Sequence, residues 1–217
     1  MKCPNCSYEP INSLLLSPCP NKNCSFNWID TEEYVEMLAE NLEIETVPDI
    51  GCGNKGVIAQ NYWENRKIKR GYACDRHIIK SLPDLWTPLL MDAKDLHNLF
   101  EHEKIDFVTH CGLLEHIDYE SAFDVLECIE KITKQKCFFT FSAFLRDVDY
   151  KVKIDGNPYH YYKSWWDVKT IECLGYHVDW DRMSQKLTFE QEVTGWFSPN
   201  EIKTPFKERK KSHSIYH

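Results

Sequence analysis

The sequence predicts an α/β protein in which a mostly parallel sheet carries helices on both faces. Short apolar segments alternate with helical segments from about residue 30 to residue 195, and this alternation is typical of β-α-β units. Two further apolar segments near the end are separated only by a short polar turn, which predicts a closing antiparallel hairpin. The 217 residues suffice for one sizeable core with a small appendage.

The seven expected strands are short and apolar. They cover residues 46–50, 71–75, 89–93, 105–110, 137–144, 176–180 and 186–193. The first strand runs directly into a glycine-rich turn, as strands in this class of fold often do.

The expected helices follow from apolar residues at helical spacing. They cover residues 30–41, 56–63, 119–132 and 165–174. Asp30 and Glu33 form a capping pair at the start of the first helix. Gly175 ends the last one.

Composition divides the chain into three parts. Residues 1–29 are rich in Cys, Pro and Asn and show no long periodic segment. Residues 30–200 carry the strands and helices. Residues 201–217 are polar and basic, which predicts a loose tail.

The charge and the apolar pattern restrict the partners. A net charge of -8 disfavours broad nucleic-acid binding, although a local basic patch stays open. No apolar run approaches the ~20 residues that span a bilayer, and the first residues lack the apolar region of a signal peptide. We therefore expect a cytoplasmic protein with a small-molecule substrate and no membrane partner. The oligomeric state stays open.

Four of the ten cysteines cluster as two close pairs, Cys3 with Cys6 and Cys19 with Cys24. Two such pairs can supply four thiolates to one tetrahedral Zn²⁺, which would stabilise a segment too small to fold by apolar burial. This predicts a structural zinc-ribbon-like segment. Recognition of a substrate or partner by the ribbon, or fortuitous cysteines without metal, are the alternatives.

The stretch VPDIGCGNKG at residues 47–56 has the glycine spacing of a nucleotide-binding turn. In nicotinamide dehydrogenases such a turn approaches a pyrophosphate, which the nearby Asp49 would repel. S-adenosylmethionine (SAM) instead carries an ammonium group that Asp49 can pair with, directly or through water. Asp49 therefore favours SAM, although Gly51 and Gly53 are also compatible with a plain tight turn.

Two acids follow later strands. Asp75 closes the second strand, where a carboxylate can accept hydrogen bonds from both hydroxyls of a ribose. Asp92 follows the third strand and can accept a bond from the adenine amino group, with Ala93 leaving room for the ring. Each acid has a structural alternative as a helix cap, and Asp92 would cap a helix at residues 94–100.

These motifs resemble those of the class I SAM-dependent methyltransferases of the small-molecule type. VPDIGCGNKG is similar to the first motif of that family, and IDFVTHCGLLEHIDY to its fourth-strand motif. NPYHYYKSWWDVKTIECLGYHV is similar to the late segment that leads into the sixth strand. The resemblance covers about residues 35–195 and implies a Rossmann-like, seven-stranded, mostly parallel sheet whose last strand is antiparallel.

The resemblance also implies a set of cofactor-binding positions. They are Asp49, Gly51, Cys52, Gly53, Gly56, Asp75, Arg76, Asp92, Ala93, His110 and Cys111. Packing is the alternative role for Cys111. The sequence departs from the family at Pro48, inside the first strand, and at Lys134-Gln135-Lys136, which replaces a glycine pair.

Methyl transfer needs alignment of donor and acceptor in a dry pocket, and a base only where the acceptor must lose a proton early. His110, His116 and His160 are the candidates for a base. Glu115 and His116 match half of a metal-binding element of some family members, but Gly112 stands where the first acid is required. That pair is equally compatible with a role in holding its loop.

The leading function is therefore methyl transfer from SAM to an O or N atom of a small metabolite or sugar-like acceptor. The alternatives are an RNA methyltransferase that uses the ribbon and the basic tail, and a non-catalytic binding module. A dehydrogenase ranks last because the remaining length holds no second substrate domain. The aromatic residues around residues 159–166 suit a lid or core better than an acceptor cage.

Overall fold

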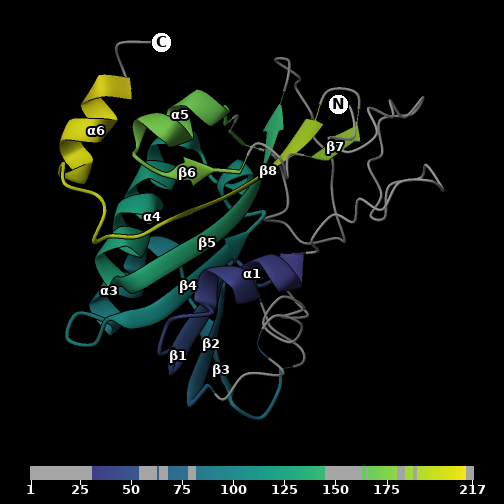
Figure 1. Cartoon of the computed structure of the whole chain (residues 1–217), viewed down its shortest axis with the longest axis vertical. Coiled ribbons are helices and arrows are strands. Elements are labelled where there is room, and N and C mark those ends of the chain that lie inside the picture. Colours follow the sequence, from purple (N-terminus) through teal and green to yellow (C-terminus); the bar gives the residue numbers. More distant parts are fainter. Residues whose placement is uncertain are drawn as a thin grey trace.

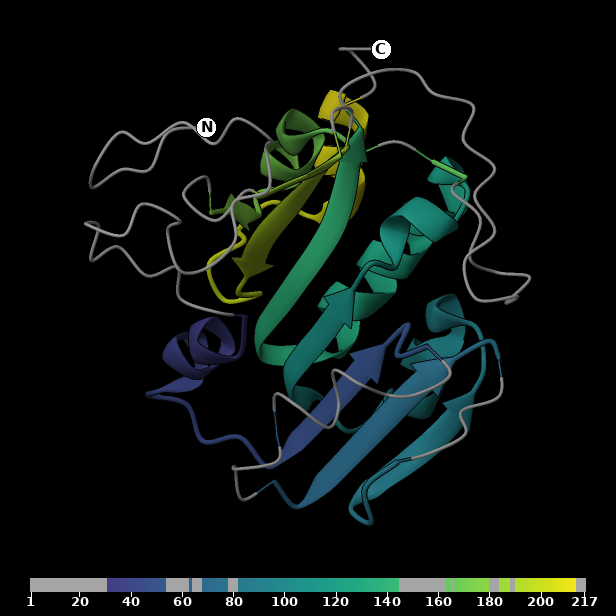
Figure 2. The ribbon, with the colours of Figure 1, turned by 90° about the vertical axis from the view of Figure 1, so that its right-hand side faces the viewer.

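The structure is a computed structural model that describes residues 31–53, 63, 68–77, 82–144, 163–164, 166–179, 184–187 and 190–213. Its centre is a twisted sheet in which seven strands follow the order β3-β2-β1-β4-β5-β8-β6 (Figures 1 and 2). The five parallel strands are β1 (Thr46–Ile50), β2 (Arg70–Asp75), β3 (Trp86–Leu90), β4 (Ile105–Cys111) and β5 (Thr133–Phe144). The predicted α/β architecture is thus confirmed.

In the described part of the chain, the antiparallel end of the sheet contains three strands, whereas the sequence predicts two. β8 (Glu190–Phe197) runs antiparallel to both β5 and β6 (His177–Val178). A further strand, β7 (Ser184–Leu187), pairs with β8 away from the main path. The expected single strand at 186–193 is therefore wrong, because its residues are shared between β7 and β8.

Helices cover both faces of the sheet, as predicted. On one face lie α4 (Tyr119–Ile132), α5 (Val168–Cys173) and the short α3 (Leu96–Leu99), and they bury the larger apolar cluster. On the other face lies α1 (Thr31–Ala39) (Figure 2), which buries a smaller cluster together with Trp63. Trp63 is the only described residue of the expected helix at 56–63. Within the described segments no helix has the length and apolarity to cross a bilayer.

Pro48 is accommodated because the backbone ladder between β1 and β4 begins only at Asp49. Before Asp49, side chains of β4 bind β1 in place of backbone groups. Asp106 Oδ2 accepts hydrogen bonds from the backbone N–H groups of Glu45 and Thr46 at 2.9 and 3.1 Å. Thr109 Oγ1 donates to the Pro48 carbonyl at 3.1 Å. The N–H that proline lacks would face this side-chain-bonded stretch, so no ladder bond is lost.

The Lys134-Gln135-Lys136 departure has a structural reason as well. Helix α4 passes directly into β5, and the Thr133 hydroxyl donates to the Ile129 carbonyl at 2.6 Å. Lys134 Nζ then reaches Asp106 Oδ1 at 2.9 Å, and Gln135 Nε2 donates to the Glu43 carbonyl at 2.7 Å. These side chains join the lower ends of β1, β4 and β5, where a glycine pair would offer no partner.

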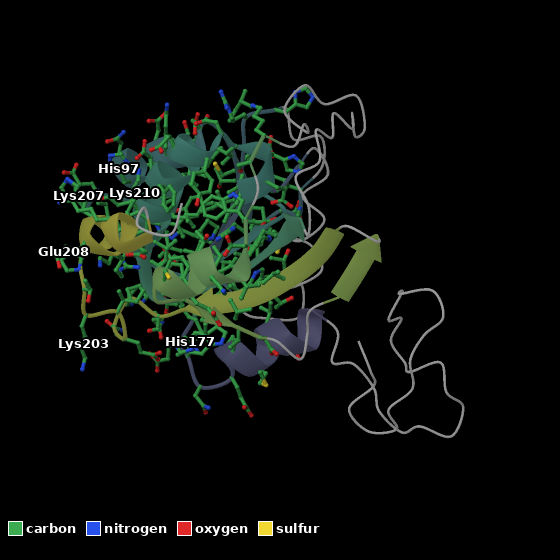
Figure 3. All side chains as sticks on the ribbon, turned by 90° about the horizontal axis from the view of Figure 1, so that it is seen from above. His97, His177, Lys203, Lys207, Glu208 and Lys210 are labelled. Carbon is green, nitrogen blue, oxygen red and sulfur yellow. The ribbon has the colours of Figure 1, made fainter. Side chains whose placement is uncertain are left out.

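The chain end is not a loose tail over residues 206–213, so that prediction is corrected. α6 (Phe206–His213) packs beside α5 (Figure 1), and its Arg209 is buried. Arg209 pairs with Glu130 of α4 at 2.6 Å and donates to the carbonyl of Leu174 at the end of α5. Lys207 and Glu208 point outward (Figure 3), so the basic residues of this helix include exposed lysines as well as one buried arginine.

Candidate functional site

A cavity of about 230 Å³ opens at the carboxyl ends of the parallel strands. It lies beside the boundary between β1 and β4, where the strand order reverses direction, and this is where open α/β sheets bind ligands. Its walls come from the segments that follow β1, β2, β3 and β4, and from the chain near residue 163. The lining residues are Gly51, Cys74, Asp75, Arg76, Met91, Asp92, Ala93, Lys94, Gly112, Leu113, His116, Ile117, Asp118, Ser121 and Lys163.

The glycine turn after β1 reaches the cavity through Gly51. Gly51 and Gly53 have φ angles of 75° and 67°, which other residues adopt only with strain. The N–H groups of Gly51 and Cys52 both donate to the Cys74 carbonyl, at 2.8 and 3.1 Å, so the turn folds over the end of β2. A Cβ atom on Gly51 would lie 2.8 Å from Leu113 Cδ1. Gly51 therefore lets the cavity wall at Leu113 approach the turn.

Asp75 stands at the carboxyl end of β2 and is tied to both neighbouring turns. Its Oδ2 accepts a hydrogen bond from Gly53 N–H and its Oδ1 one from His77 N–H, each at 2.8 Å. A carboxylate offers about four lone-pair sites. Two of these sites hold the side chain in place. The others can still accept hydrogen bonds from a ligand in the cavity that Asp75 lines.

Asp92 and Ala93 lie across the cavity at the end of β3, where the short 3-10 helix η1 (Ala93–Asp95) begins. Asp92 Oδ1 accepts a hydrogen bond from Lys94 N–H at 3.2 Å, so the capping role is present. Asp92 Oδ2 lies 3.7 Å from Arg76 Nε. The cap leaves Asp92 on the cavity wall, so the structural role and a binding role are compatible.

Asp49, Cys52 and Gly53 are not among the lining residues. The Asp49 side chain is fully buried on the α1 side of the sheet, and its Oδ1 accepts a hydrogen bond from Thr109 Oγ1 at 3.3 Å. Cys52 is buried as well. Burial, followed by the charges of Asp49 and Asp75, raises the pKa of the Cys52 thiol, so it stays protonated.

His110 and Cys111 end β4 but also lie outside the cavity lining. His110 is fully buried and stacks on Phe139 with ring centroids 5.5 Å apart. Burial lowers the pKa of His110 to about 3, which keeps the ring neutral. Within the described part of the chain neither ring nitrogen takes part in a hydrogen bond.

His116 does line the cavity, and its position is fixed by a short docked segment. It ends the 3-10 helix η2 (Leu114–His116), whose Glu115 carbonyl accepts hydrogen bonds from the N–H groups of Lys163 and Ser164 at 2.7 and 3.3 Å. Ser164 Oγ donates to the Leu114 carbonyl and accepts from Trp166 Nε1, both at 2.9 Å. Trp166 is buried in the core, as the packing interpretation predicts.

Some predicted site residues lie outside the described part of the chain. They are Cys3, Cys6, Cys19, Cys24, Gly56 and His160. The zinc segment therefore stays a prediction. Among the described residues there is no cluster of three or more His, Cys, Asp or Glu side chains that suits a metal ion.

Several residues of the cavity lining are not among those that the sequence predicts. Leu113 and Ile117 supply apolar surface there, and Lys163 returns to the site from far along the chain. The Leu-Glu-His-Ile run at residues 114–117 gave a signal for both, since Ile117 ends the run and Leu113 directly precedes it. Nothing local indicates Lys163, because a backbone bond to Glu115 brings it in.

Known structures share this fold. A 1,6-didemethyltoxoflavin-N1-methyltransferase from Burkholderia thailandensis, solved with its substrate and S-adenosylhomocysteine (SAH), is 14% identical. It aligns over 77% of this chain and 79% of its own with a TM-score of 0.52. A SAM-dependent methyltransferase from Clostridium acetobutylicum is 15% identical over 75% of this chain and 87% of its own, with a TM-score of 0.50.

An O-methyltransferase family protein from Burkholderia thailandensis is 15% identical with a TM-score of 0.45, and this chain spans only 54% of its length. No protein-family model matches the sequence, and no curated protein matches it. The two structures with TM-scores of 0.52 and 0.50 show the fold alone, which this chain shares with SAM-dependent methyltransferases.

Proposed function

We propose that this protein is a SAM-dependent methyltransferase. The observation that carries the proposal is that Asp75 and Asp92, from the ends of β2 and β3, line one cavity at the point where the strand order reverses. Carboxylates in these two places suit a nucleoside, whose ribose and amino group both donate hydrogen bonds. A pyrophosphate would be repelled there.

The chain fits the nucleoside part of SAM. Asp75 keeps acceptor capacity for the ribose hydroxyls after binding Gly53 and His77. Asp92 would accept the adenine amino group, with Ala93 leaving space for the ring. Leu113 and Ile117 would pack against the ring from the opposite wall.

The amino-acid part of SAM would lie over the glycine turn. Gly51 and Gly53 allow the backbone to approach a ligand closely, and Asp49 would act on the ammonium group through water because its side chain is buried beneath the turn. When bound, SAM supplies a methyl group activated by a sulfonium. An acceptor lone pair would form the new bond to that methyl carbon as the carbon–sulfur bond breaks, and SAH would be the leaving group.

Catalysis by the protein would consist mainly of alignment and exclusion of water. His116 is the described histidine that lines the cavity, so we propose it as the base that takes the acceptor proton where one must leave; His160 stays a second candidate. His110 is neutral and buried and has no role in proton transfer in this proposal. The acceptor would be a small metabolite or sugar-like molecule with an oxygen or nitrogen nucleophile.

Calorimetric titration of the full chain with SAM and SAH tests the proposal. We expect 1:1 binding, and a loss of at least about 50-fold in SAH affinity for Asp75→Ala, because hydrogen bonds to a charged group are lost. Asp84→Ala is the matched control, an exposed acid outside the cavity lining. Folded protein that binds neither compound would refute the proposal.

We also propose that the four N-terminal cysteines bind one structural Zn²⁺. Their two close pairs support this proposal. Elemental analysis of the purified chain should give about one zinc per chain, and Cys3→Ser with Cys6→Ser should remove it. The Cys52→Ser and Cys74→Ser variants are controls that should keep it, since both thiols are buried near the cavity instead. Zinc-free protein with all four thiols reduced would contradict the proposal.

A further inference from the structure

The sheet face that packs against α1 changes from apolar to polar toward the carboxyl end of β4. Nearer the start of β4, Phe107 is buried with Phe138 in the apolar cluster with α1, and Trp196 packs against this cluster. Two residues further along the same face stand Thr109, Thr140 and Thr194, because side chains alternate between faces along a strand. The upper part of this face is therefore polar although it is buried.

Three of the upper side chains form a row across β4, β5 and β8. Cys111 pairs with Thr140 in the β4–β5 register, and Thr140 pairs with Thr194 in the β5–β8 register. Paired residues on neighbouring strands carry Cβ atoms about 5 Å apart. We call Cys111, Thr140 and Thr194 the polar row. Thr140 and Thr194 are each only 6% exposed, and Cys111 is half-buried.

The polar row adjoins the cavity without belonging to its lining. Gly112, which lines the cavity, directly follows Cys111, and its N–H donates to the Thr140 carbonyl at 2.9 Å. Strands β5 and β8 lie on one side of β4, and β2 and β3 lie on the other (Figure 2). The row runs from β4 across β5 to β8 and so extends away from Asp75 at the end of β2 and Asp92 after β3. A ligand whose nucleoside end is at β2 and β3 would thus point its other end toward the row.

The chemistry of the row is uncharged. Its members are one thiol and two hydroxyls, which donate and accept hydrogen bonds but do not neutralise charge. A buried hydroxyl group, such as that of Thr140 or Thr194, destabilises the protein unless it has a hydrogen-bond partner. Hydroxyl or amide groups satisfy such side chains, whereas a phosphate-rich acceptor requires cations.

We propose that Cys111, Thr140 and Thr194 form the surface that binds the methyl acceptor, and that the acceptor is an uncharged small molecule with hydroxyl or amide groups. This inference rests on the proposed function. It assigns to the site a substrate class and three contact residues, and it places the acceptor over β4, β5 and β8.

The test uses the full chain and methyl-tritiated SAM. A low-molecular-mass metabolite extract is separated by ion exchange at pH 7 into neutral, cationic and anionic pools, and total RNA forms a fourth acceptor sample. We expect label to enter the neutral pool. Label confined to a charged pool or to RNA, or no label in any sample, would overturn the inference.

Isosteric variants test the residues themselves. Thr140→Val and Thr194→Val remove only the hydroxyls, and each should slow transfer to the neutral pool about fivefold to tenfold at subsaturating acceptor. Their SAH affinity should stay within about twofold of the wild type, which shows that the fold and donor site are intact. Thr87→Val, on the exposed edge strand β3, is the control. Unchanged transfer by both variants would refute the role of the row.

A second readout does not depend on turnover. With SAH bound, the neutral pool should slow alkylation of Cys111 by iodoacetamide, followed by peptide mass spectrometry, whereas alkylation of the exposed Cys173 should not change. Equal alkylation of Cys111 with and without the pool would contradict the inference. If the wild type fails to bind SAH in calorimetry, the proposed function itself fails, so the two failures are distinguishable.

Discussion

At the scale of single residues, comparing Gly51 with Gly53 distinguishes the cost of backbone strain from the cost of a steric clash when each is replaced by alanine. Both have positive φ angles, so an alanine at either position is strained by about 1 to 2 kcal/mol. Among the described residues, a Cβ on Gly53 meets no atom within 4 Å, whereas one on Gly51 meets Leu113 at 2.8 Å. The two alanine substitutions thus share the backbone strain, but only Gly51→Ala also introduces a steric clash.

We expect Gly53→Ala to lower the free energy of unfolding by about 1 to 2 kcal/mol. Gly51→Ala should lower it by a further 1 kcal/mol or so, because Leu113 must shift. Since Leu113 lines the cavity, Gly51→Ala should also weaken SAH binding more than Gly53→Ala does. Urea unfolding and calorimetry measure both quantities. Equal losses of affinity would show that contact with Leu113 does not shape the site.

Asp106 is a second residue with a definable contribution. Burial alone would raise its pKa, but hydrogen bonds from Lys134, from the backbone of Glu45 and from Thr46 outweigh burial and lower it. Its carboxylate is therefore bound more favourably in the folded state. Asp106→Asn should lower the free energy of unfolding by about 2 to 3 kcal/mol near pH 7.

The same shift fixes the pH dependence of that loss. A lowered pKa gives stability that is present above the unfolded pKa, about 4, and disappears as the pH falls through the folded value. The difference between wild type and Asp106→Asn should therefore shrink below about pH 4. Asp84→Asn, at an exposed position, should show little difference at any pH. A constant difference down to pH 2 would contradict the assignment.

The predicted site residues that lie on the cavity wall are mainly those at strand ends. Asp75 ends β2 and Asp92 follows β3, and parallel strands bring such ends to one edge whatever their pleat. Asp49 and His110 lie within strands that are buried on both faces, so no apolar alternation indicates which way they point. Their placement off the cavity wall was therefore beyond reach of the sequence.

At the scale of elements, α6 is held by one buried arginine. Arg209 donates to both carboxylate oxygens of Glu130 at 2.8 and 2.6 Å, and to the carbonyls of Thr204 and Leu174. It thereby joins α6 to α4 and to the end of α5. Removing one partner of a buried ion pair leaves the other charge without compensation.

We expect Arg209→Met to lower the free energy of unfolding by about 3 kcal/mol or more in urea titration. Lys207→Met, on the outer side of the same helix, should change it by less than about 0.5 kcal/mol. Adding Glu130→Gln to Arg209→Met should remove part of the loss, because the uncompensated carboxylate disappears. Additive losses would show that the two side chains stabilise independently.

The elements that the sequence misplaced have local reasons. The third strand was expected at 89–93 but lies at Trp86–Leu90, because Pro88 suggests a loop. β3 is the edge of the sheet, where one side of a strand needs no ladder bond, so proline is tolerated. For α6, the run KERKK suggests a solvated tail. Its buried described positions are Phe206 and Arg209, and one apolar residue gives no apolar stripe to detect.

At the scale of the whole molecule, the alternation of strands and helices was enough to predict the layers and the mostly parallel sheet. The division of the last strand into β7 and β8 was not predictable in the same way. β8 is central between β5 and β6, whereas β7 only extends its end, and both consist of mixed polar and apolar residues without a turn signal between them.

The cavity joins segments that are distant along the chain, so a bound nucleoside would stabilise the fold as a unit. Its lining combines the turn after β1, the ends of β2 and β3, η2 and Lys163. SAH at about 100 times its dissociation constant should stabilise the protein by about 2.7 kcal/mol. For a chain of this size that corresponds to a rise in the midpoint of thermal unfolding of about 5 to 11 °C.

Thermal unfolding followed by circular dichroism checks this expectation. At the same SAH concentration Asp75→Ala should show at most about a quarter of the rise, because a loss of about 50-fold in affinity leaves a stabilisation of only about 0.65 kcal/mol, whereas Asp84→Ala should keep the full rise. Methionine alone should give no rise either, since it lacks the nucleoside that Asp75 and Asp92 would hold. A rise of equal size in Asp75→Ala would mean that SAH binds elsewhere, and that the two strand-end acids do not form the nucleoside site.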